Sequence, residues 1–374
     1  MKIVCKKSDL LNSVNIVLKA VSSKTTMPIL ECMVIDVSSG QIKLISNDME
    51  LAIETIVKGD ILEGSTNKMI AINAKVFSEI IRKLSDNDIT VETDDNYMMS
   101  ITCEKAKFTI SGKSADEFPT LPMIEKQEPV VLSQFTLKEI IRQTVFSISD
   151  NESNKIMTGE LFEITGDELR VVSLDGHRIS IRKIKLKDNF GNIKVIVPGK
   201  TLIEISKILS GEMSDEISLY FTDKHVLFEM EDTLVLSRLI EGEYYKINQM
   251  LSNDYETKIV INKKEFFNCI DRSTLLIKET EKKPIIVGVT DGNMELKINS
   301  NIGSMKEEID IVKEGKDILI GFNPKFLMDV LRVVDDEEVT IYMINPKSPC
   351  FIKDKEESYI YLILPVNFNA AAQA

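Results

Sequence analysis

The chain has 374 residues, of which 43% are hydrophobic and 28% are charged, and its net charge is −13. This composition excludes a disordered or collagen-like chain, and the length allows two to four domains. The acidic balance argues against a nucleic-acid binder that works through overall charge and against a polybasic membrane-surface protein. Any attraction to phosphate groups would have to be local.

Few residues are available for metal or nucleophilic chemistry. The five cysteines are scattered without a CxxC pair, and the chain has two histidines and no tryptophan. We therefore expect no disulfide framework, metal site, cofactor or catalytic triad. No apolar stretch approaches the ~18 residues of a membrane span. The start of the chain reaches Asp9 before a signal-peptide core can form, so we expect a cytoplasmic protein.

The first third of the chain alternates between helical and strand patterns. A helix is expected to begin at Ser8, a good N-cap residue, because apolar residues follow at positions 10, 11, 14, 17 and 18. The alternating residues 42–48 predict a strand that ends in a polar turn. Residues 73–84 have the apolar stripe of an amphipathic helix, and strand-like alternation resumes at residues 89–92.

The middle third repeats this order. Charged residues and a proline at 125–129 first interrupt the periodicity. A helix is then expected from Thr136 and a strand over residues 169–175. An amphipathic helix over residues 198–209 and a strand at residues 217–220 complete the set.

The last third repeats it again, after a polar stretch at residues 252–256. A helix is expected from Asn262, a strand over residues 296–301 and an amphipathic helix over residues 323–334. Alternation resumes at residues 339–342. The same order of strands and helices therefore occurs three times along the chain.

The three amphipathic helices also share a charge pattern. Each has a base at its third residue, an acid at its seventh and a base at its tenth, and the first bases, Lys75, Lys200 and Lys325, are 125 residues apart. Short turns between strands favour antiparallel sheets. We therefore predict an α+β protein of three similar domains at 1–125, 129–252 and 256–368, with a tail at 369–374. Triplication without a shared purpose remains the alternative.

Positive charge is concentrated on the expected helices. Their six windows together carry +9, so the rest of the chain carries −22. Any single helix with this charge is ordinary, since solvated faces are often charged. Six helices of one sign in an acidic protein suit a sequence-independent partner with regular negative charge, such as duplex DNA contacted through its phosphates. Helices lining the inside of a ring would attract DNA while acidic outer sheets repel it.

Five short motifs accompany the repeats, at residues 27–30 (Met-Pro-Ile-Leu), 116–119 (Asp-Glu-Phe-Pro), 175–178 (Asp-Gly-His-Arg), 320–323 (Ile-Gly-Phe-Asn) and 362–366 (Leu-Ile-Leu-Pro-Val). With them the chain resembles the bacterial β sliding clamps, the processivity subunits of DNA polymerase III, from its start to Phe368. The resemblance implies the DNA clamp fold, with antiparallel sheets outside and two helices per domain facing a central hole. It also implies a head-to-tail homodimeric ring around double-stranded DNA, without a catalytic site of its own.

The helices and the family pattern together suggest which residues contact DNA phosphates: Lys24, Lys75, Arg82, Arg142, Lys155, Lys200, Lys207, Lys325 and Arg332. The resemblance places Phe108 and Ile110 of one subunit against Leu276 and Ile277 of the next, although these four also suit an ordinary core. It further implies a groove that takes a short peptide from the replicative polymerase, the clamp loader or repair proteins. The groove residues would be Leu174, Gly176, His177, Arg178, Ile179, Tyr245, Met250, Asn323, Phe326, Leu362, Leu364, Pro365 and Val366.

Two departures from the family pattern put the groove's preferred peptide in doubt. The family usually has Phe-Pro-Asp-Tyr where this chain has Tyr244-Tyr245-Lys246-Ile247, and it usually has Arg where this chain has Asn367. Two other functions stay open. A protein-only scaffold would use the groove without encircling DNA. A nucleotide hydrolase would use the strand and Gly-Lys-Thr at residues 195–201, but a P-loop needs a glycine at position 194, which is Lys.

Overall fold

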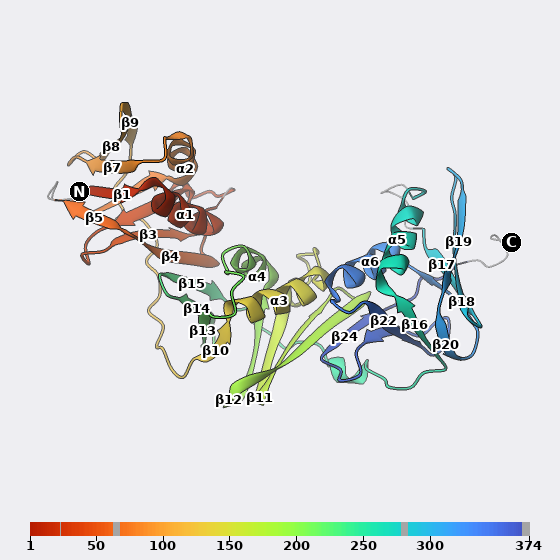
Figure 1. The fold of residues 1–374 in the computed structure, drawn as a ribbon. Helices are drawn as coiled ribbons and strands as arrows, with labels where there is room; N and C mark the ends of the chain where they lie inside the picture. The colour runs from red at the N-terminus through yellow and green to blue at the C-terminus, as the bar shows by residue number, and fades with distance from the viewer. Residues whose placement is uncertain (23, 63–67, 278–282, 369–374) are drawn as a thin grey trace. The chain divides into compact units, whose positions relative to one another are not determined.

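A computed structural model describes residues 1–22, 24–62, 68–277 and 283–368; the predicted tail at 369–374 lies outside this part of the chain. Strands and helices alternate along the chain as Figure 1 shows, and the described residues contain six α-helices. Every strand pairing among them is antiparallel. The predicted α+β class is confirmed.

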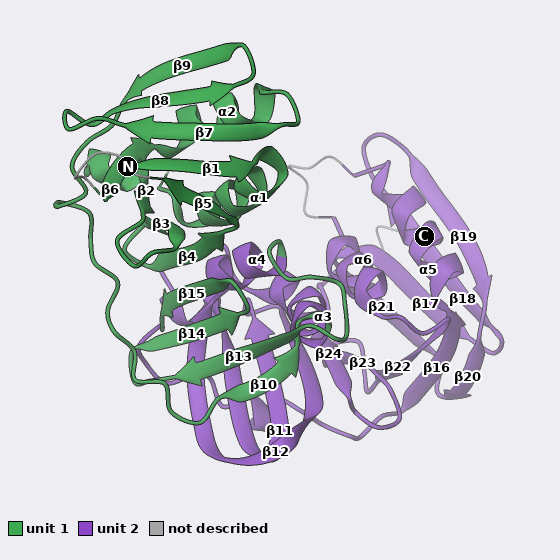
Figure 2. Cartoon of the chain, turned by 60° about the vertical axis from the view of Figure 1, so that its left-hand side comes forward, with its two compact units in different colours: residues 1–135, 207–239 green, residues 136–206, 240–374 purple. Residues whose placement is uncertain are grey.

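Contacts between residues divide the chain into two compact units, residues 1–135 with 207–239 and residues 136–206 with 240–374, which are coloured separately in Figure 2. The first unit contains two helices, α1 (Lys7–Val17) and α2 (Ala74–Lys83), which pack against each other. Its strands are β1 (Lys2–Lys6), β2 (Cys32–Asp36), β3 (Ile42–Asn47), β4 (Leu51–Val57), β5 (Gly59–Leu62), β6 (Met69–Asn73), β7 (Asp88–Thr93), β8 (Met98–Cys103), β9 (Ala106–Ser111), β10 (Val130–Ser133), β13 (Glu216–Phe221), β14 (His225–Met230) and β15 (Thr233–Arg238).

The second unit begins within α3 (Gln134–Thr144) and also contains α4 (Gly199–Ser206), α5 (Lys263–Thr274) and α6 (Pro324–Val333). Helices α5 and α6 pack against each other, as α1 and α2 do in the first unit. The strands of this unit are β11 (Gly159–Leu174), β12 (Arg178–Pro198), β16 (Thr257–Asn262), β17 (Ile285–Thr290), β18 (Asn293–Asn299), β19 (Ser304–Asp310), β20 (Val312–Gly315), β21 (Ile318–Phe322), β22 (Glu338–Met343), β23 (Cys350–Lys353) and β24 (Tyr359–Ile363).

Two large sheets join neighbouring repeats. In the first unit an eight-stranded sheet has the order β10-β13-β14-β15-β4-β3-β2-β6, so β15 from the second repeat pairs with β4 from the first. In the second unit a seven-stranded sheet has the order β11-β12-β24-β23-β22-β16-β20, and β24 from the third repeat pairs with β12 from the second. Each unit also has a smaller sheet, β5-β1-β7-β8-β9 and β19-β18-β17-β21. Because the repeats share sheets, the compact units do not follow the expected three-domain division, which stays a prediction.

The helix starts agree with the sequence at some positions and differ at others. Asn73, Asn262 and Asn323 each accept a backbone N–H of the first helical turn with their side chains, so the predicted cap at Asn262 is confirmed. The predicted caps at Ser8 and Thr136 are wrong, because α1 begins at Lys7 and α3 at Gln134. There the preceding strand runs straight into the helix. The first N–H groups donate instead to the carbonyls of Asn87 and Asp215.

The predicted helices and strands bury the apolar residues that their periodicity indicates. In α2 the buried residues include Phe77 and Ile81, whereas Lys75, Arg82 and Lys83 on the other side are exposed. The strands predicted at residues 42–48, 89–92, 217–220 and 339–342 all form. All five cysteines are buried free thiols. No helix in the described ranges is long and apolar enough to cross a membrane.

Candidate functional site

Several predicted groove residues from distant parts of the sequence come together where β12 meets β24. Ile179 lies opposite Leu362 in the strand register, and both side chains are buried with Leu174 in one apolar cluster. Ile247 and Leu251, which flank Met250 in the sequence, join the same cluster. These parts of the predicted groove therefore share one well-packed apolar cluster.

The turn between β11 and β12 positions the next groove residues. The Asp175 carboxylate accepts the backbone N–H groups of His177 (2.9 Å) and Arg178 (3.1 Å). Gly176 has φ +88°, a conformation that side chains with a Cβ rarely adopt. The Asp-Gly pair therefore makes a tight turn that exposes His177 and directs Arg178 inward.

Arg178 is the centre of a buried polar network. Its guanidinium donates to Asp175 (3.0 Å), to Asp329 (2.6 Å) and to the backbone carbonyl of Phe146 (2.6 Å). It also lies 4.5 Å from the ring centroid of Phe326, close enough for a cation–π contact. The sequence reasoning found Arg178 and Phe326 but missed Asp329 and Phe146. The available signal was the acid at the seventh position of the repeated helix.

Helix α6 supplies the aromatic part of the rim. The rings of His177 and Phe326 are stacked, with centroids 6.1 Å apart and an interplanar angle of 23°. Asn323 caps α6 by accepting the N–H of Lys325 at 3.0 Å, which fixes the start of the helix beside this turn. The predicted residues Asn323 and Phe326 thus position and extend the apolar surface.

The chain after β24 forms another wall. The N–H of Leu364 donates to the carbonyl of His177 (2.9 Å), and the N–H of Val366 donates to that of Gly321 (2.8 Å). A Cβ on Gly321 would approach the Val366 oxygen to 2.7 Å, so only glycine permits this close approach. Leu364 remains 36% exposed. The motifs at residues 320–323 and 362–366 therefore contact each other in the folded chain.

Tyr245 and Met250 present further accessible apolar surface. Met250 is one of the most exposed large apolar residues of this unit, and the Tyr245 hydroxyl accepts a hydrogen bond from the Asn154 amide at 2.7 Å. The preceding residue, Tyr244, is buried, and burial raises the pKa of its hydroxyl. Tyr244 packs in the same apolar cluster as Leu174 and Leu362.

The nine basic residues proposed for DNA contact differ in their surroundings. Eight are exposed, and Arg142 is half-buried between Glu139 and Asp335, which raise its pKa. Arg82 pairs with Glu79 (2.7 Å) and Arg332 with Asp329 (3.3 Å). Within the described ranges no carboxylate lies at ion-pair distance from four lysines: Lys24, Lys75, Lys155 and Lys325. No carboxylate of the described ranges therefore neutralises the charge of these four lysines.

The four residues predicted at the subunit interface are not core residues. Phe108 is 41% exposed on β9, an end strand of its sheet, and Ile110 on the same strand is half-buried. Leu276 and Ile277 follow α5 and are also half-buried. Both β9 and β19, at the end of the other small sheet, leave one edge without a strand partner among the described residues.

The Gly-Lys-Thr sequence at residues 199–201, which matches only the second half of a P-loop motif, is explained by packing. A Cβ on Gly199 would come within 2.3 Å of the Ile148 side chain and 2.9 Å of the Thr158 carbonyl. Glycine is therefore needed here so that the start of α4 can pack closely against the chain before β11.

Three family models match consecutive parts of the chain: the DNA polymerase III beta subunit N-terminal domain over residues 1–122, the central domain over 131–246 and the C-terminal domain over 248–367. A beta sliding clamp of Staphylococcus aureus (strain Mu50 / ATCC 700699) is 34% identical over 98% of this chain and 99% of its own.

Solved structures give the same result. The crystal structure of a DNA polymerase III beta subunit from Eubacterium rectale ATCC 33656 is 63% identical, with a TM-score of 0.95 over 98% of this chain and all of that one. The DNA polymerase sliding clamp from Bacillus subtilis is 34% identical, with a TM-score of 0.93 over 99% of this chain and 100% of its own. The repeated unit and the shared sheets define a three-domain clamp architecture. The chain belongs to the DNA polymerase III beta subunit family, the bacterial beta sliding clamps.

Proposed function

We propose that the protein encircles duplex DNA as a head-to-tail homodimer and tethers the replicative polymerase, the clamp loader and repair proteins for processive synthesis. The observation that carries this proposal is the match of three successive clamp domains over almost the whole chain. Each subunit would supply three domains, and two subunits would close the ring. The protein would have no catalytic site and would act by holding its partners on DNA.

Contact with DNA would be loose and independent of sequence. Lys75 and Lys325 stand at equivalent positions of α2 and α6, both exposed and both without a carboxylate partner in the described part of the chain. Phosphate contacts of this kind are weakened by salt and carry no base specificity. Weak contacts let a ring slide, and its topology prevents it from dissociating.

A retention experiment tests encirclement. The protein is loaded onto a nicked circular duplex and separated from free protein, and the circle is then cut at one site. A ring remains on the closed circle and leaves the linear molecule over its ends. Equal loss from both substrates would contradict encirclement and favour a scaffold that does not surround DNA.

The subunit interface would pair the exposed edge of β9 with the β19 side of the next subunit. Replacing Phe108 with Asp places a charge in this apolar contact, so the mass measured in solution should fall from dimer to monomer. Thr109→Asp is the matched control, because successive residues of a strand point to opposite faces. A dimer that survives Phe108→Asp would contradict this interface.

The groove would bind a short partner peptide through its apolar rim. A chain that stops after Ile363 lacks the wall formed by Leu364, Pro365 and Val366, and it should lose capture of a peptide taken from a DNA polymerase while remaining dimeric. A chain that stops after Phe368 is the control and should bind normally. Unchanged peptide affinity in the shorter chain would contradict the groove assignment.

A further inference from the structure

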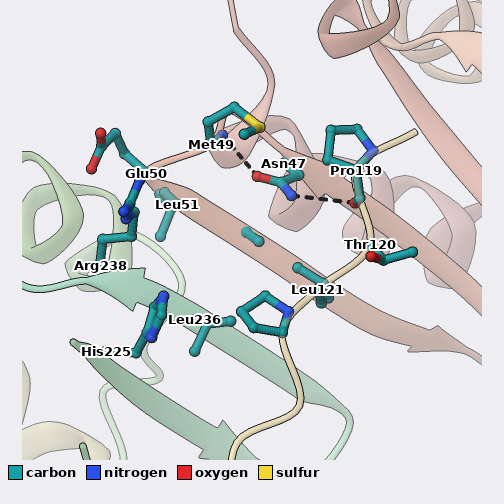
Figure 3. A pocket seen from close by; sticks show the side chains of 12 residues that line it. Asn47, Met49, Glu50, Leu51, Pro119, Thr120, Leu121, His225, Leu236 and Arg238 are labelled. Carbon is teal, nitrogen blue, oxygen red and sulfur yellow. Dashed lines mark hydrogen bonds between the residues drawn. The ribbon is translucent and has the colours of Figure 1, made fainter. Parts of the chain in front are cut away.

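The first unit contains a cavity at the position that corresponds, by the internal repeat, to the groove just described. The cavity has a volume of about 170 Å³ and is lined by twelve residues, most of which Figure 3 labels: Asn47, Met49, Glu50, Leu51, Ala52, Pro119, Thr120, Leu121, Pro122, His225, Leu236 and Arg238. All of them belong to the first unit.

Three hydrogen bonds from backbone N–H groups and a strand pairing correspond between the two sites. The N–H of Arg238 donates to the carbonyl of Glu50 at 2.9 Å, as that of Leu364 does to His177 at 2.9 Å. The Asp48 carboxylate accepts the N–H groups of Glu50 (3.1 Å) and Leu51 (2.8 Å), as Asp175 does for the equivalent turn. Leu236 pairs with Ala52 across the strands, as Leu362 pairs with Ile179. The cavity is therefore the repeat-related copy of the groove.

The third wall also corresponds. Phe118 is buried before the segment that crosses the cavity, just as Tyr244 is buried before Tyr245. In Figure 3 Pro119 lies beside Asn47 and Leu121 lies on the side nearer Leu236, and the Asn47 amide donates to the Pro119 carbonyl at 3.4 Å. The segment from Pro119 to Pro122 therefore lines one side of the cavity.

The size and lining of the cavity indicate what it would hold. Leu51, Leu121 and Leu236 give it apolar walls, and Met49 at its mouth is 47% exposed. A cavity of roughly 150 Å³ accommodates a benzene-sized group. The space therefore suits one bulky apolar side chain and is too small for a drug-sized ligand.

The charged residues that line the cavity indicate which group a ligand would carry beside its apolar side chain. Arg238 is exposed, and no carboxylate of the described residues lies within ion-pair distance of its guanidinium. His225 lines the same side, and burial together with the positive charges of Arg238 and Lys224 lowers its pKa. Glu50 is the acid in the lining. A carboxylate next to the apolar side chain of a bound peptide would form an ion pair with Arg238.

We infer that this cavity, defined by Leu51, Leu121, Leu236 and Arg238, is a second peptide-binding site, and that it takes a partner segment in which an acidic residue adjoins a bulky apolar residue. The apolar side chain fills the cavity, and the acidic side chain pairs with Arg238. The site lies in the first unit and does not depend on the groove of the second unit. One clamp chain would then offer two attachment points.

Methyl NMR on the full chain tests this site with two peptides, acetyl-Asp-Phe-Asp-amide and acetyl-Asn-Phe-Asn-amide. The acidic peptide should shift the methyl signals of Leu51, Leu121 and Leu236 in a saturable way. The neutral peptide should bind about threefold more weakly, the size of one exposed ion pair. Arg238→Gln should abolish this difference, and Glu50→Gln should strengthen binding of the acidic peptide.

Three results would overturn the assignment. These are no shift at the three leucines, equal affinity for the two peptides, or shifts confined to Leu362 and Leu364 in the second unit. The chain that stops after Ile363 separates this site from the groove, because it should lose polymerase-peptide capture and keep the response of the three leucines. If that chain keeps both, the groove assignment fails while the cavity assignment stands.

Discussion

The turn at residues 48–51 and the turn at residues 175–178 have the same backbone and different chemistry. In each, an aspartate accepts the same two N–H groups, and the next strand pairs in the same register. The buried position that Leu51 fills in the first turn is taken in the second by Arg178, with its carboxylate partners. The two copies thus share their main-chain conformation and differ in the side chain at the buried position.

The largest expected effect comes from making the second turn like the first. Arg178→Leu leaves the carboxylates of Asp175 and Asp329 without their buried partner, which should lower the free energy of unfolding by about 3–5 kcal/mol. Urea denaturation measures this loss. The double variant Arg178→Leu, Asp329→Leu should recover much of it, and a single variant that loses under about 1 kcal/mol would contradict the role of the network.

A second difference between repeats lies in the core. Met33, Glu160 and Ile285 occupy equivalent strand positions, opposite Ile72, Val197 and Phe322, and all three are buried. One oxygen of Glu160 accepts from the Thr144 hydroxyl (3.1 Å), and the other has no hydrogen-bond partner among the described residues. Burial raises the pKa of Glu160 to about 8 from an ordinary 4.5, so the carboxyl is neutral at pH 7.

The sign of the resulting pH dependence follows from proton binding. Between pH 4.5 and 8 the folded state holds this proton and the unfolded state releases it, so stability falls as the pH rises. Glu160→Gln removes the titration and should stabilise the protein on the order of 3 kcal/mol at pH 7, with little change below pH 4. Thermal unfolding from pH 4 to 8 checks this, and parallel curves for the two proteins would refute it.

The helix starts supply a smaller comparison. Asn262 caps α5, whereas Ser8 lies inside α1 with its side chain exposed and capping nothing. Asn262→Ala should therefore lower stability by about 1 kcal/mol, and Ser8→Ala should change it by less than about 0.5 kcal/mol. Equal losses measured by denaturation would show that the strand-to-helix junction before α1 needs its serine.

The smallest effect concerns the second residue of each turn. Met49 has φ +77° and Gly176 has φ +88°, so methionine holds a conformation that glycine adopts without strain. Gly176→Ala should lower stability by about 1 kcal/mol, because the new Cβ meets no atom within 4 Å and only the backbone is strained. Met49→Gly should raise it by about 0.5 kcal/mol, since relief of strain outweighs the added freedom of the unfolded chain. A loss of stability in the Met49→Gly variant, measured by urea denaturation, would show instead that the Met49 side chain stabilises its turn.

Much of the site could be predicted from local sequence, and some of it could not. The Asp-Gly turn and the apolar stripe of α6 are local features, so their residues were identified from the sequence. The partner of Arg178 was not, because Asp329 lies 151 residues away and an acid at that helix position is equally at home in solvent. Gly321 likewise could not be explained from local sequence, because a Cβ there would meet Val366 and Phe368, which lie more than 40 residues further along the chain.

The sequence alone determined the α+β class and the threefold repeat, because helix and strand periods of buried residues and the 125-residue spacing of charges are properties of the chain itself. Tertiary structure decided which strands the repeats share, where the helices begin at Lys7 and Gln134, and which buried acid meets which base. Those outcomes depend on pairings between residues distant in sequence. A pairing is a property of two segments, and neither segment encodes it alone.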